Sequence, residues 1–157
     1  MIRNPMTPEG YAARVAELDH LKSVVRGGIV RDIEEARAHG DISENAEYED
    51  AKERQALCEG RINALEGIVA SSEIIDVKKL TPSDRVVFGT TVTLENPEGV
   101  ERTWRIVGEE EASVEDGRIS FKSPLGRSLI GHSEGEEVVV PAPSGRQIWE
   151  IIEVQYI

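Results

Sequence analysis

The amino-acid sequence predicts an α+β protein: an N-terminal antiparallel coiled-coil hairpin of two long helices, followed by a compact antiparallel β domain with one short helix. Up to about residue 72, apolar residues recur every three or four positions, which is the period of a helix. From residue 85 onward, short β-rich segments alternate with turn residues. Residues 77–84, between the two patterns, have the composition of a linker. We therefore expect a helical domain over residues 1–76 and a β domain over residues 85–157.

The first helix is predicted from about Glu9 to His39, with a roughly 45 Å length at 1.5 Å per residue. Its apolar stripe consists of Tyr11, Val15, Leu18, Leu21, Val25, Ile29, Ile33 and Ala36. Gly27 and Gly28 each lower the helix propensity by about 1 kcal/mol relative to alanine. They mark a bend, a close approach of a second helix, or a tolerated weak position.

The second helix carries a heptad seam, with spacings that alternate between three and four. Its members are Tyr48, Ala51, Gln55, Cys58, Ile62, Leu65, Val69 and Ser72. Gly40 suits the C-terminal end of the first helix, and Asp41 or Ser43 suits the N-cap of the second. Because the connection is short, the two helices must lie antiparallel and bury their stripes on each other. Cys58 is accordingly predicted to be a core residue.

The second half predicts five β segments and one short helix. The β segments span residues 85–95, 100–107, 118–121, 137–140 and 147–156, with turn signals such as Asn96-Pro97-Glu98-Gly99 between them. The helix is expected within residues 123–131, with Ser123 as its cap, Pro124 in its first turn and Gly131 just past its end.

Composition excludes several classes of function. The chain of 157 residues has a net charge of −12, which disfavours general binding to nucleic acid or to anionic membranes. It has no apolar run long enough to span a bilayer and no apolar signal segment at its start. Its single cysteine, Cys58, indicates a reducing, cytoplasmic setting. There is no P-loop, GxGxxG, CxxC or HExxH motif.

The predicted turn of the hairpin, residues 40–50, is strongly acidic. Residues 41–50 contain five carboxylates, and Asp41 and Glu44 have the spacing of a capping box. The same two side chains, one helical turn apart, also have the chemistry to share a hard cation such as Mg²⁺, if a partner supplied its other ligands. From the residues alone both interpretations stay open, although a long rod that ends in paired carboxylates suits the delivery of charge to a distant site.

The sequence resembles the GreA/GreB family of bacterial transcription elongation (transcript cleavage) factors over nearly its whole length. The first matching residues are Pro5-Met6-Thr7, followed by Glu34, Ala36, Arg37, His39, Gly40, Asp41, Ser43, Glu44, Asn45, Ala46, Glu47 and Tyr48. The match continues through Cys58-Glu59-Gly60-Arg61-Ile62, Val87-Phe88-Gly89, Thr91, Val92, Arg105-Ile106-Val107-Gly108, Ile119, Ser123-Pro124 and Leu129-Ile130-Gly131. The string around Asp41 and Glu44 is specific because it stands between two helical runs, as the family requires.

The resemblance implies an accessory factor of RNA polymerase and not an enzyme in its own right. It implies that the hairpin enters the secondary channel of RNA polymerase, and that an FKBP-like C-terminal domain docks at the channel rim. Asp41 and Glu44 would then act as catalytic carboxylates in trans, sharing a second Mg²⁺ with the polymerase and binding none tightly alone. The polymerase would cleave the 3′ end of backtracked RNA and resume synthesis.

Two further sets of residues follow from the resemblance. Arg37 and Lys52 match a small basic patch that steers the extruded RNA; the alternative is ordinary solvated charge. The segment with Ser123, Pro124, Leu125 and Arg127 matches the part of the family's second domain that contacts polymerase. For Pro124 and Leu125 the alternative is helix capping and core packing.

Other functions remain as alternatives. A related protein could occupy the same channel and inhibit, although the intact Asp41 and Glu44 favour cleavage. The acidity and the sparse basic patch are more similar to GreA than to GreB, which implies short extruded RNA. Less favoured are a peptidyl-prolyl isomerase, suggested by the FKBP-like half, and a coiled-coil holdase. A monomer suits entry into a narrow channel.

Overall fold

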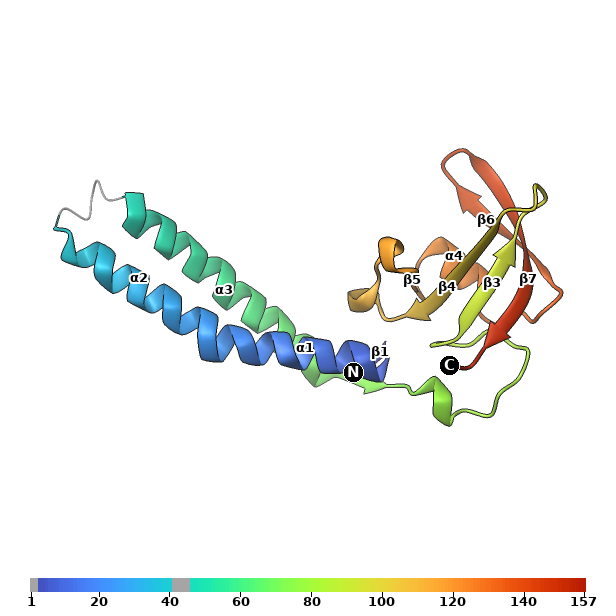
Figure 1. Ribbon diagram of the computed structural model, residues 1–157, viewed down its shortest axis with the longest axis horizontal. Helices are drawn as coiled ribbons and strands as arrows, with labels where there is room; N and C mark the ends of the chain where they lie inside the picture. Colours follow the sequence, from blue (N-terminus) through green and yellow to red (C-terminus); the bar gives the residue numbers. More distant parts are fainter. Residues whose placement is uncertain (1–2, 41–45) are drawn as a thin grey trace. The chain divides into compact units, whose positions relative to one another are not determined.

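The computed structural model of the protein describes residues 3–40 and 46–157, which form two compact units. The helical hairpin is Tyr11–Ser72, and the β domain combines Arg3–Gly10 with Glu73–Ile157. Figure 1 follows the chain through both units. The sequence prediction assigned residues 1–76 to the helical part, whereas the compact units group the first described residues with the β domain.

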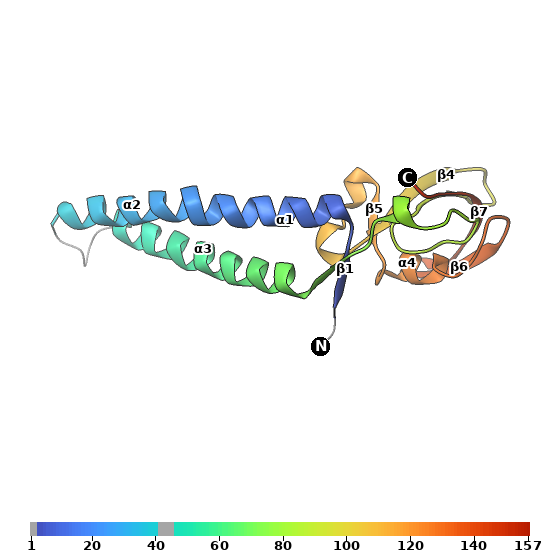
Figure 2. The same ribbon diagram turned by 90° about the horizontal axis from the view of Figure 1, so that it is seen from below.

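The hairpin consists of α1 (Pro8–His20), a π-helical turn (Leu21–Val25), α2 (Arg26–Ala38) and α3 (Ala46–Ser71). In Figure 2 α3 runs back alongside α2 and α1. The two predicted apolar stripes meet in one core of Ile29, Ile33, Ala51, Cys58 and Ile62, against which Leu18, Leu21, Val25 and Tyr48 pack. Cys58 is 7% exposed and is a core residue, as its place on the seam predicts. None of the helices in the described part of the chain has the length and apolar content to cross a bilayer.

The first helical run is not one regular helix as the sequence predicted. A π-helical turn interrupts it at Leu21–Val25, just before Gly27 and Gly28. A Cβ atom added at Gly27 would have no neighbour within 4 Å, and one at Gly28 would meet only the Arg31 side chain at 3.9 Å. The glycines therefore do not serve a close helix approach. They adjoin a π-turn, a feature that bends helices.

Bidentate ion pairs are among the contacts that connect the facing helices along the hairpin. Arg61 donates to both carboxylate oxygens of Glu17 at 2.7 and 3.0 Å, and Arg26 donates to Glu59 at 2.9 and 2.8 Å. The hydrogen bonds from Arg61 hold the pKa of the Glu17 carboxyl below its ordinary value. Exposed pairs contribute little energy, but bidentate pairing is geometrically specific, so these contacts help to set the register of the two helices.

The β domain is built on a five-stranded sheet in the order β5-β4-β3-β7-β6. Its strands are β3 (Thr91–Glu95), β4 (Glu101–Val107), β5 (Arg118–Ser120), β6 (Glu137–Ala142) and β7 (Gly145–Gln155). The short helix α4 (Pro124–Leu129) adds Leu129 to a core made by alternate strand residues. That core contains Val86, Val92, Leu94, Ile106, Ile119, Leu129, Val138, Val140, Ile151 and Val154.

One pair of strands departs from the predicted antiparallel sheet. β5 lies parallel to β4, with Ile106 opposite Ile119. The connection between them, residues 108–117, contains the 3₁₀ turns Glu109–Glu111 and Val114–Asp116. It carries the chain from the end of β4 back to a position beside Arg105, so the next strand runs in the same direction. A tight hairpin would have made the pair antiparallel.

A second, two-stranded sheet pairs β1 (Asn4–Met6) with β2 (Ser72–Ile74). The sequence analysis did not predict these strands, since each has only three residues and no alternating pattern. Met6 and Thr7 are nevertheless buried, and so is Val77 in the predicted linker. The ends of the hairpin are therefore joined by β structure and packed residues, and Val77 opens a 3₁₀ turn (Val77–Lys79) instead of an extended linker.

Candidate functional site

The predicted catalytic site belongs to the turn that joins α2 to α3. The α2 helix ends at Ala38, and Gly40 has a positive φ of 102°, the conformation that favours glycine after a helix. The α3 helix begins at Ala46. Asp41 and Glu44 lie outside the described residues, so their catalytic and metal-binding roles remain predictions. What the structure describes is the pair of helix ends that flank them.

Contacts between the two helix ends close the hairpin beside the turn. The Nδ1 atom of His39 lies 3.3 Å from a carboxylate oxygen of Glu47, and the Arg37 guanidinium lies 5.9 Å from the centre of the Tyr48 ring. The first contact is an ion pair when His39 is protonated, and the second is a cation–π contact. Both join α2 to the first turn of α3, so the ends of the turn are held close together.

The basic residues near the turn have different partners. Lys52 donates to the neutral Gln55 side chain at 3.1 Å, and it forms no ion pair within the described ranges. Lys52 is four residues from Tyr48, so it shares a helix face with the residue that Arg37 contacts. No contact between Arg37 and Lys52 is found among the described residues, so their role as an RNA-steering patch remains a prediction.

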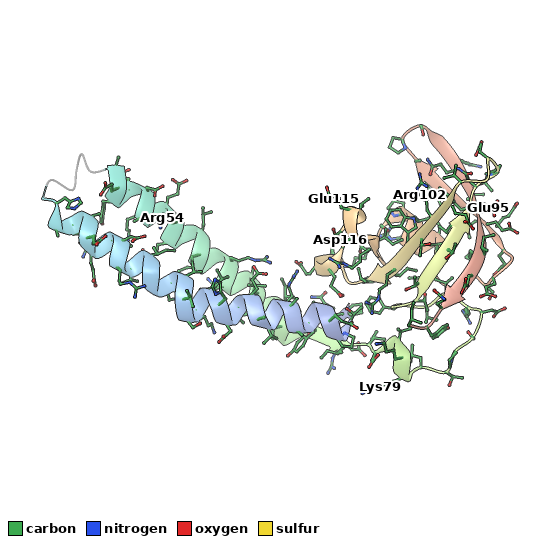
Figure 3. The ribbon with its side chains drawn as sticks, viewed as in Figure 1. Arg54, Lys79, Glu95, Arg102, Glu115 and Asp116 are labelled. Atoms are coloured by element: carbon green, nitrogen blue, oxygen red, sulfur yellow. The ribbon has the colours of Figure 1, made fainter. Side chains whose placement is uncertain are left out.

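Arg54 has a structural role that the sequence analysis did not identify. It donates to Asp32 on α2 at 3.0 Å and to Asp50 on α3 at 3.0 Å, and its position on α3 is labelled in Figure 3. The hydrogen bonds to Asp32 and Asp50 raise the pKa of Arg54 above its ordinary value. The Asp50–Arg54 spacing of four residues was a detectable signal, but the contact with Asp32 depends on the hairpin register.

The predicted docking segment forms the start of α4. Ser123 caps the helix: its hydroxyl accepts a hydrogen bond from the Gly126 N–H at 3.1 Å and donates to the Ser120 carbonyl at 2.7 Å. Pro124 occupies the first turn, as predicted. Gly126 is required there, since an added Cβ would lie 2.3 Å from the Ser120 carbonyl oxygen. The segment is therefore held rigidly in the β domain.

The exposure of this segment separates packing residues from surface residues. Leu125 is half-buried and packs against the core, whereas Pro124 and Arg127 are exposed. Next to the segment, Lys122 lies 5.8 Å from the centre of the Phe121 ring. Leu125 thus has the packing role that the sequence left open. Pro124 and Arg127 are exposed at the surface, and Lys122 is exposed but pairs with Glu109 at 3.4 Å.

Comparison with known proteins identifies the family. Residues 4–74 match the family model described as "Transcription elongation factor, N-terminal", and residues 81–156 match "Transcription elongation factor, GreA/GreB, C-term". The chain is 49% identical to "Transcription elongation factor GreA" of Ruegeria pomeroyi and 52% identical to that of Hyphomonas neptunium, with 99% of both chains covered in each case.

A solved structure with a related name also aligns with the chain. It is "GreA factor homolog 1 (Gfh1) protein of Thermus thermophilus", 24% identical over 98% of this chain and 99% of that one, with a TM-score of 0.44. The two family models together match nearly all of the sequence, and the curated relatives are about half identical along their full length. The chain therefore belongs to the GreA/GreB family of transcription elongation factors.

Proposed function

We propose that this protein binds bacterial RNA polymerase, inserts the turn of its hairpin into the secondary channel, and stimulates the polymerase's own cleavage of backtracked RNA. The observation that carries the proposal is the placement of the string Gly40-Asp41-Ile42-Ser43-Glu44 at the connection of two long antiparallel helices. The identity of about half with proteins named GreA along their full length supports it.

The chemistry of the carboxylates suits a shared magnesium ion. Oxygen donors are the ligands that Mg²⁺ prefers, and two carboxylates leave most of its six positions to other groups. Within residues 3–40 and 46–157 no cluster of three or more candidate ligands exists, so the remaining ligands would come from the polymerase and from water. A second Mg²⁺ held there would help to activate water and to stabilise the leaving oxygen of the phosphodiester.

Asp41 and Glu44 would have different roles in the site. Asp41 supplies a carboxylate oxygen to the second metal position. Glu44 accepts a hydrogen bond from the attacking water, orients it and takes its proton. Neither role requires the protein to bind RNA strongly by itself, which agrees with its net charge of −12. The polymerase holds the RNA and the first metal, so this chain completes an active site in trans.

The decisive experiment uses purified RNA polymerase that is stalled on DNA with labelled, backtracked RNA in the presence of Mg²⁺. The wild-type protein should shorten the RNA from its 3′ end. The double variant Asp41→Asn, Glu44→Gln should bind the polymerase equally well but cut about 100-fold or more slowly, since it lacks the metal-binding charge and the general base. Binding is measured separately, by co-migration with the polymerase.

Three outcomes would contradict this assignment. If the double variant loses binding, the carboxylates act as helix caps and not as catalysts. If the wild-type protein binds but leaves the RNA intact or slows synthesis, the protein is a channel-binding inhibitor. If the wild-type protein neither binds the polymerase nor stimulates RNA cleavage, the hairpin has another partner. The alternatives are then a peptidyl-prolyl isomerase or a holdase.

The basic patch gives a second prediction. Replacing Arg37 and Lys52 together by glutamate should weaken cleavage about tenfold and reduce its dependence on salt concentration, since contacts with phosphate release counterions. Cleavage rates are measured over a series of salt concentrations. Arg54→Glu is not a suitable control because it breaks the pairs with Asp32 and Asp50. Arg31→Glu, an exposed position on α2, is the matched control and should leave the salt dependence unchanged.

A further inference from the structure

Strand β7 extends beyond the strand that pairs with it on one side. It pairs with β6 from Gly145 to Glu150, but its pairing with β3 begins only at Glu150, opposite Glu95. There β3 ends, and the chain turns into β4 through residues 96–99. Residues 145–149 of β7 are therefore paired along one edge only. Figure 1 shows the β3–β4 and β6–β7 turns at the same end of the sheet.

The direction of the main-chain groups along β7 follows from printed hydrogen bonds at its paired part. The Ile151 N–H donates to the Glu136 carbonyl at 2.9 Å, and the Ile151 carbonyl accepts from the Gly135 N–H at 2.8 Å. Ile151 thus faces the β6 side, and alternation along an antiparallel ladder turns Ile148 and Arg146 the other way. Pro141, which has no N–H, lies opposite Arg146 as this alternation requires.

The open edge of β7 faces a cavity and is not covered by tightly packed residues. A cavity of about 370 Å³ lies between the turn at Asn96, Pro97 and Glu98 and residues 146–149 of β7. A smaller cavity of about 130 Å³ adjoins it and shares three lining residues, Asn96, Pro97 and Ile148. No hydrogen bond beyond the β6–β7 ladder is found for the main chain of Arg146 or Ile148 in the described structure.

The side chains around this edge are apolar and acidic. Ile148 and Val139 lie opposite each other and are 43% and 52% exposed. On the same face, Glu150 lies opposite both Glu137 and Glu95, and none of these three carboxylates forms an ion pair with a described residue. Figure 3 labels Glu95 at the end of β3. Like charges opposite each other destabilise a sheet, so a cation placed among them would be favourable.

We propose that the open edge of β7 at residues 146–149 binds an extended, basic segment of another protein as an added β-strand. The segment would continue the line of β3 and pair its main chain with Ile148 and Arg146, which is a known mode of peptide recognition. An apolar side chain would pack on Ile148, and a neighbouring lysine or arginine would approach the Glu95–Glu150–Glu137 row. The open edge of β7 and the cavity beside it set the position of the segment. The carboxylates of the Glu95–Glu150–Glu137 row favour a positively charged segment. The proposal does not depend on transcript cleavage.

The test uses the full-length chain labelled with ¹⁵N and a capped Lys-Val-Lys-Val-Lys-Val peptide, at about 150 mM salt to screen distant charges. Peptide-induced shifts should concentrate at residues 95–98 and 146–150. Ile148→Pro removes the N–H at the open edge together with the isoleucine side chain on which the segment would pack, and it should weaken binding about tenfold. Val139→Pro is the matched control: it belongs to the same residue pair and face, but its N–H points to the far edge of β6. That variant should bind the peptide normally.

A peptide with the same sequence and N-methyl groups on alternate residues tests strand addition without changing the protein, so the test survives if Ile148→Pro does not fold. It should bind about tenfold more weakly, and a Glu-Val peptide should not bind. The proposal fails if the methylated peptide binds as well as the plain one, if Ile148→Pro and Val139→Pro behave alike, or if the shifts spread over the acidic hairpin. Self-association of the wild type that Ile148→Pro alone abolishes would assign the edge to a second copy and overturn the basic partner.

Discussion

Glu111 is 7% exposed, and its carboxylate accepts hydrogen bonds from the Thr7 N–H at 3.0 Å, the Thr7 hydroxyl and the Gly108 N–H at 2.9 Å. Two glycines make room for it. An added Cβ at Gly10 would lie 2.0 Å from the Glu111 Oε1 atom, and one at Gly108 would lie 2.5 Å from the Pro5 carbonyl oxygen. A single buried acid therefore holds the start of α1 and the turn after β4 in one arrangement.

Removal of this carboxylate should be costly. Glu111→Ala leaves buried donors of Thr7 and Gly108 without their acceptor, so the free energy of unfolding should fall by about 2–3 kcal/mol. Urea unfolding measures the change. Glu115→Ala, at an exposed position in the same connection, is the control and should change stability by less than about 0.5 kcal/mol. Equal effects of the two substitutions would mean that the Glu111 hydrogen bonds contribute no net stability.

The Glu17–Arg61 pair predicts a pH dependence. Because the folded state lowers the pKa of Glu17, the pair contributes stability above the unfolded value of 4.5, and this contribution is lost as the pH falls through the folded value. Arg61→Met should cost about 0.5–1 kcal/mol at neutral pH, a small effect because both side chains are partly exposed. Urea midpoints should converge with those of the wild type at about pH 3. A difference that persists there would show that Arg61 acts through packing, and exposed Arg31→Met is the control.

At the scale of elements, the apolar periodicity predicted the long helices well. It did not predict short elements or pairings that depend on distant parts of the chain. The stripes that contain Ile29, Ile33 and Ile62 do form the hairpin core, and α4 begins at the predicted cap. The π-turn was missed because the spacings of four between Leu21, Val25 and Ile29 also fit a regular α-helix. β1 and β2 are too short for a pattern, and the parallel pairing of β4 with β5 depends on the path of residues 108–117, which composition does not encode.

The glycines beside the π-turn give a prediction for this element. Gly27→Ala and Gly28→Ala should each stabilise the protein by about 0.5–1 kcal/mol, since the added methyl meets open space and alanine restricts the unfolded chain. Thermal unfolding measures the effect. Gly126→Ala in α4 is the contrasting variant, and it should destabilise because the methyl would meet the Ser120 carbonyl. Destabilisation at position 27 or 28 would indicate that the bend near the π-turn needs glycine.

At the scale of the whole molecule, the division into a helical and a β half followed from composition and period, and the family followed from the motif around Asp41. The candidate site was predictable only in part. The charges of Arg37 and Lys52 are visible in the sequence. The Arg37–Tyr48 contact and the Arg54–Asp32 hydrogen bond, in contrast, depend on the register between α2 and α3. The open edge of β7 could not be foreseen, since it results from the difference in length between two strands that are over 50 residues apart.

The hydrogen bonds between Thr7 and Glu111 span 104 positions of sequence, and they enclose the whole of Tyr11–Ser72. The hairpin is thus an insertion between the first strand of the β domain and the rest of it. During synthesis on the ribosome, α2 and α3 can pair as soon as both have emerged, while β1 must wait for β2 and Thr7 for Glu111. Residues made before the hairpin are therefore among the last to reach their final partners, and until then Met6, buried in the finished protein, stays open to solvent.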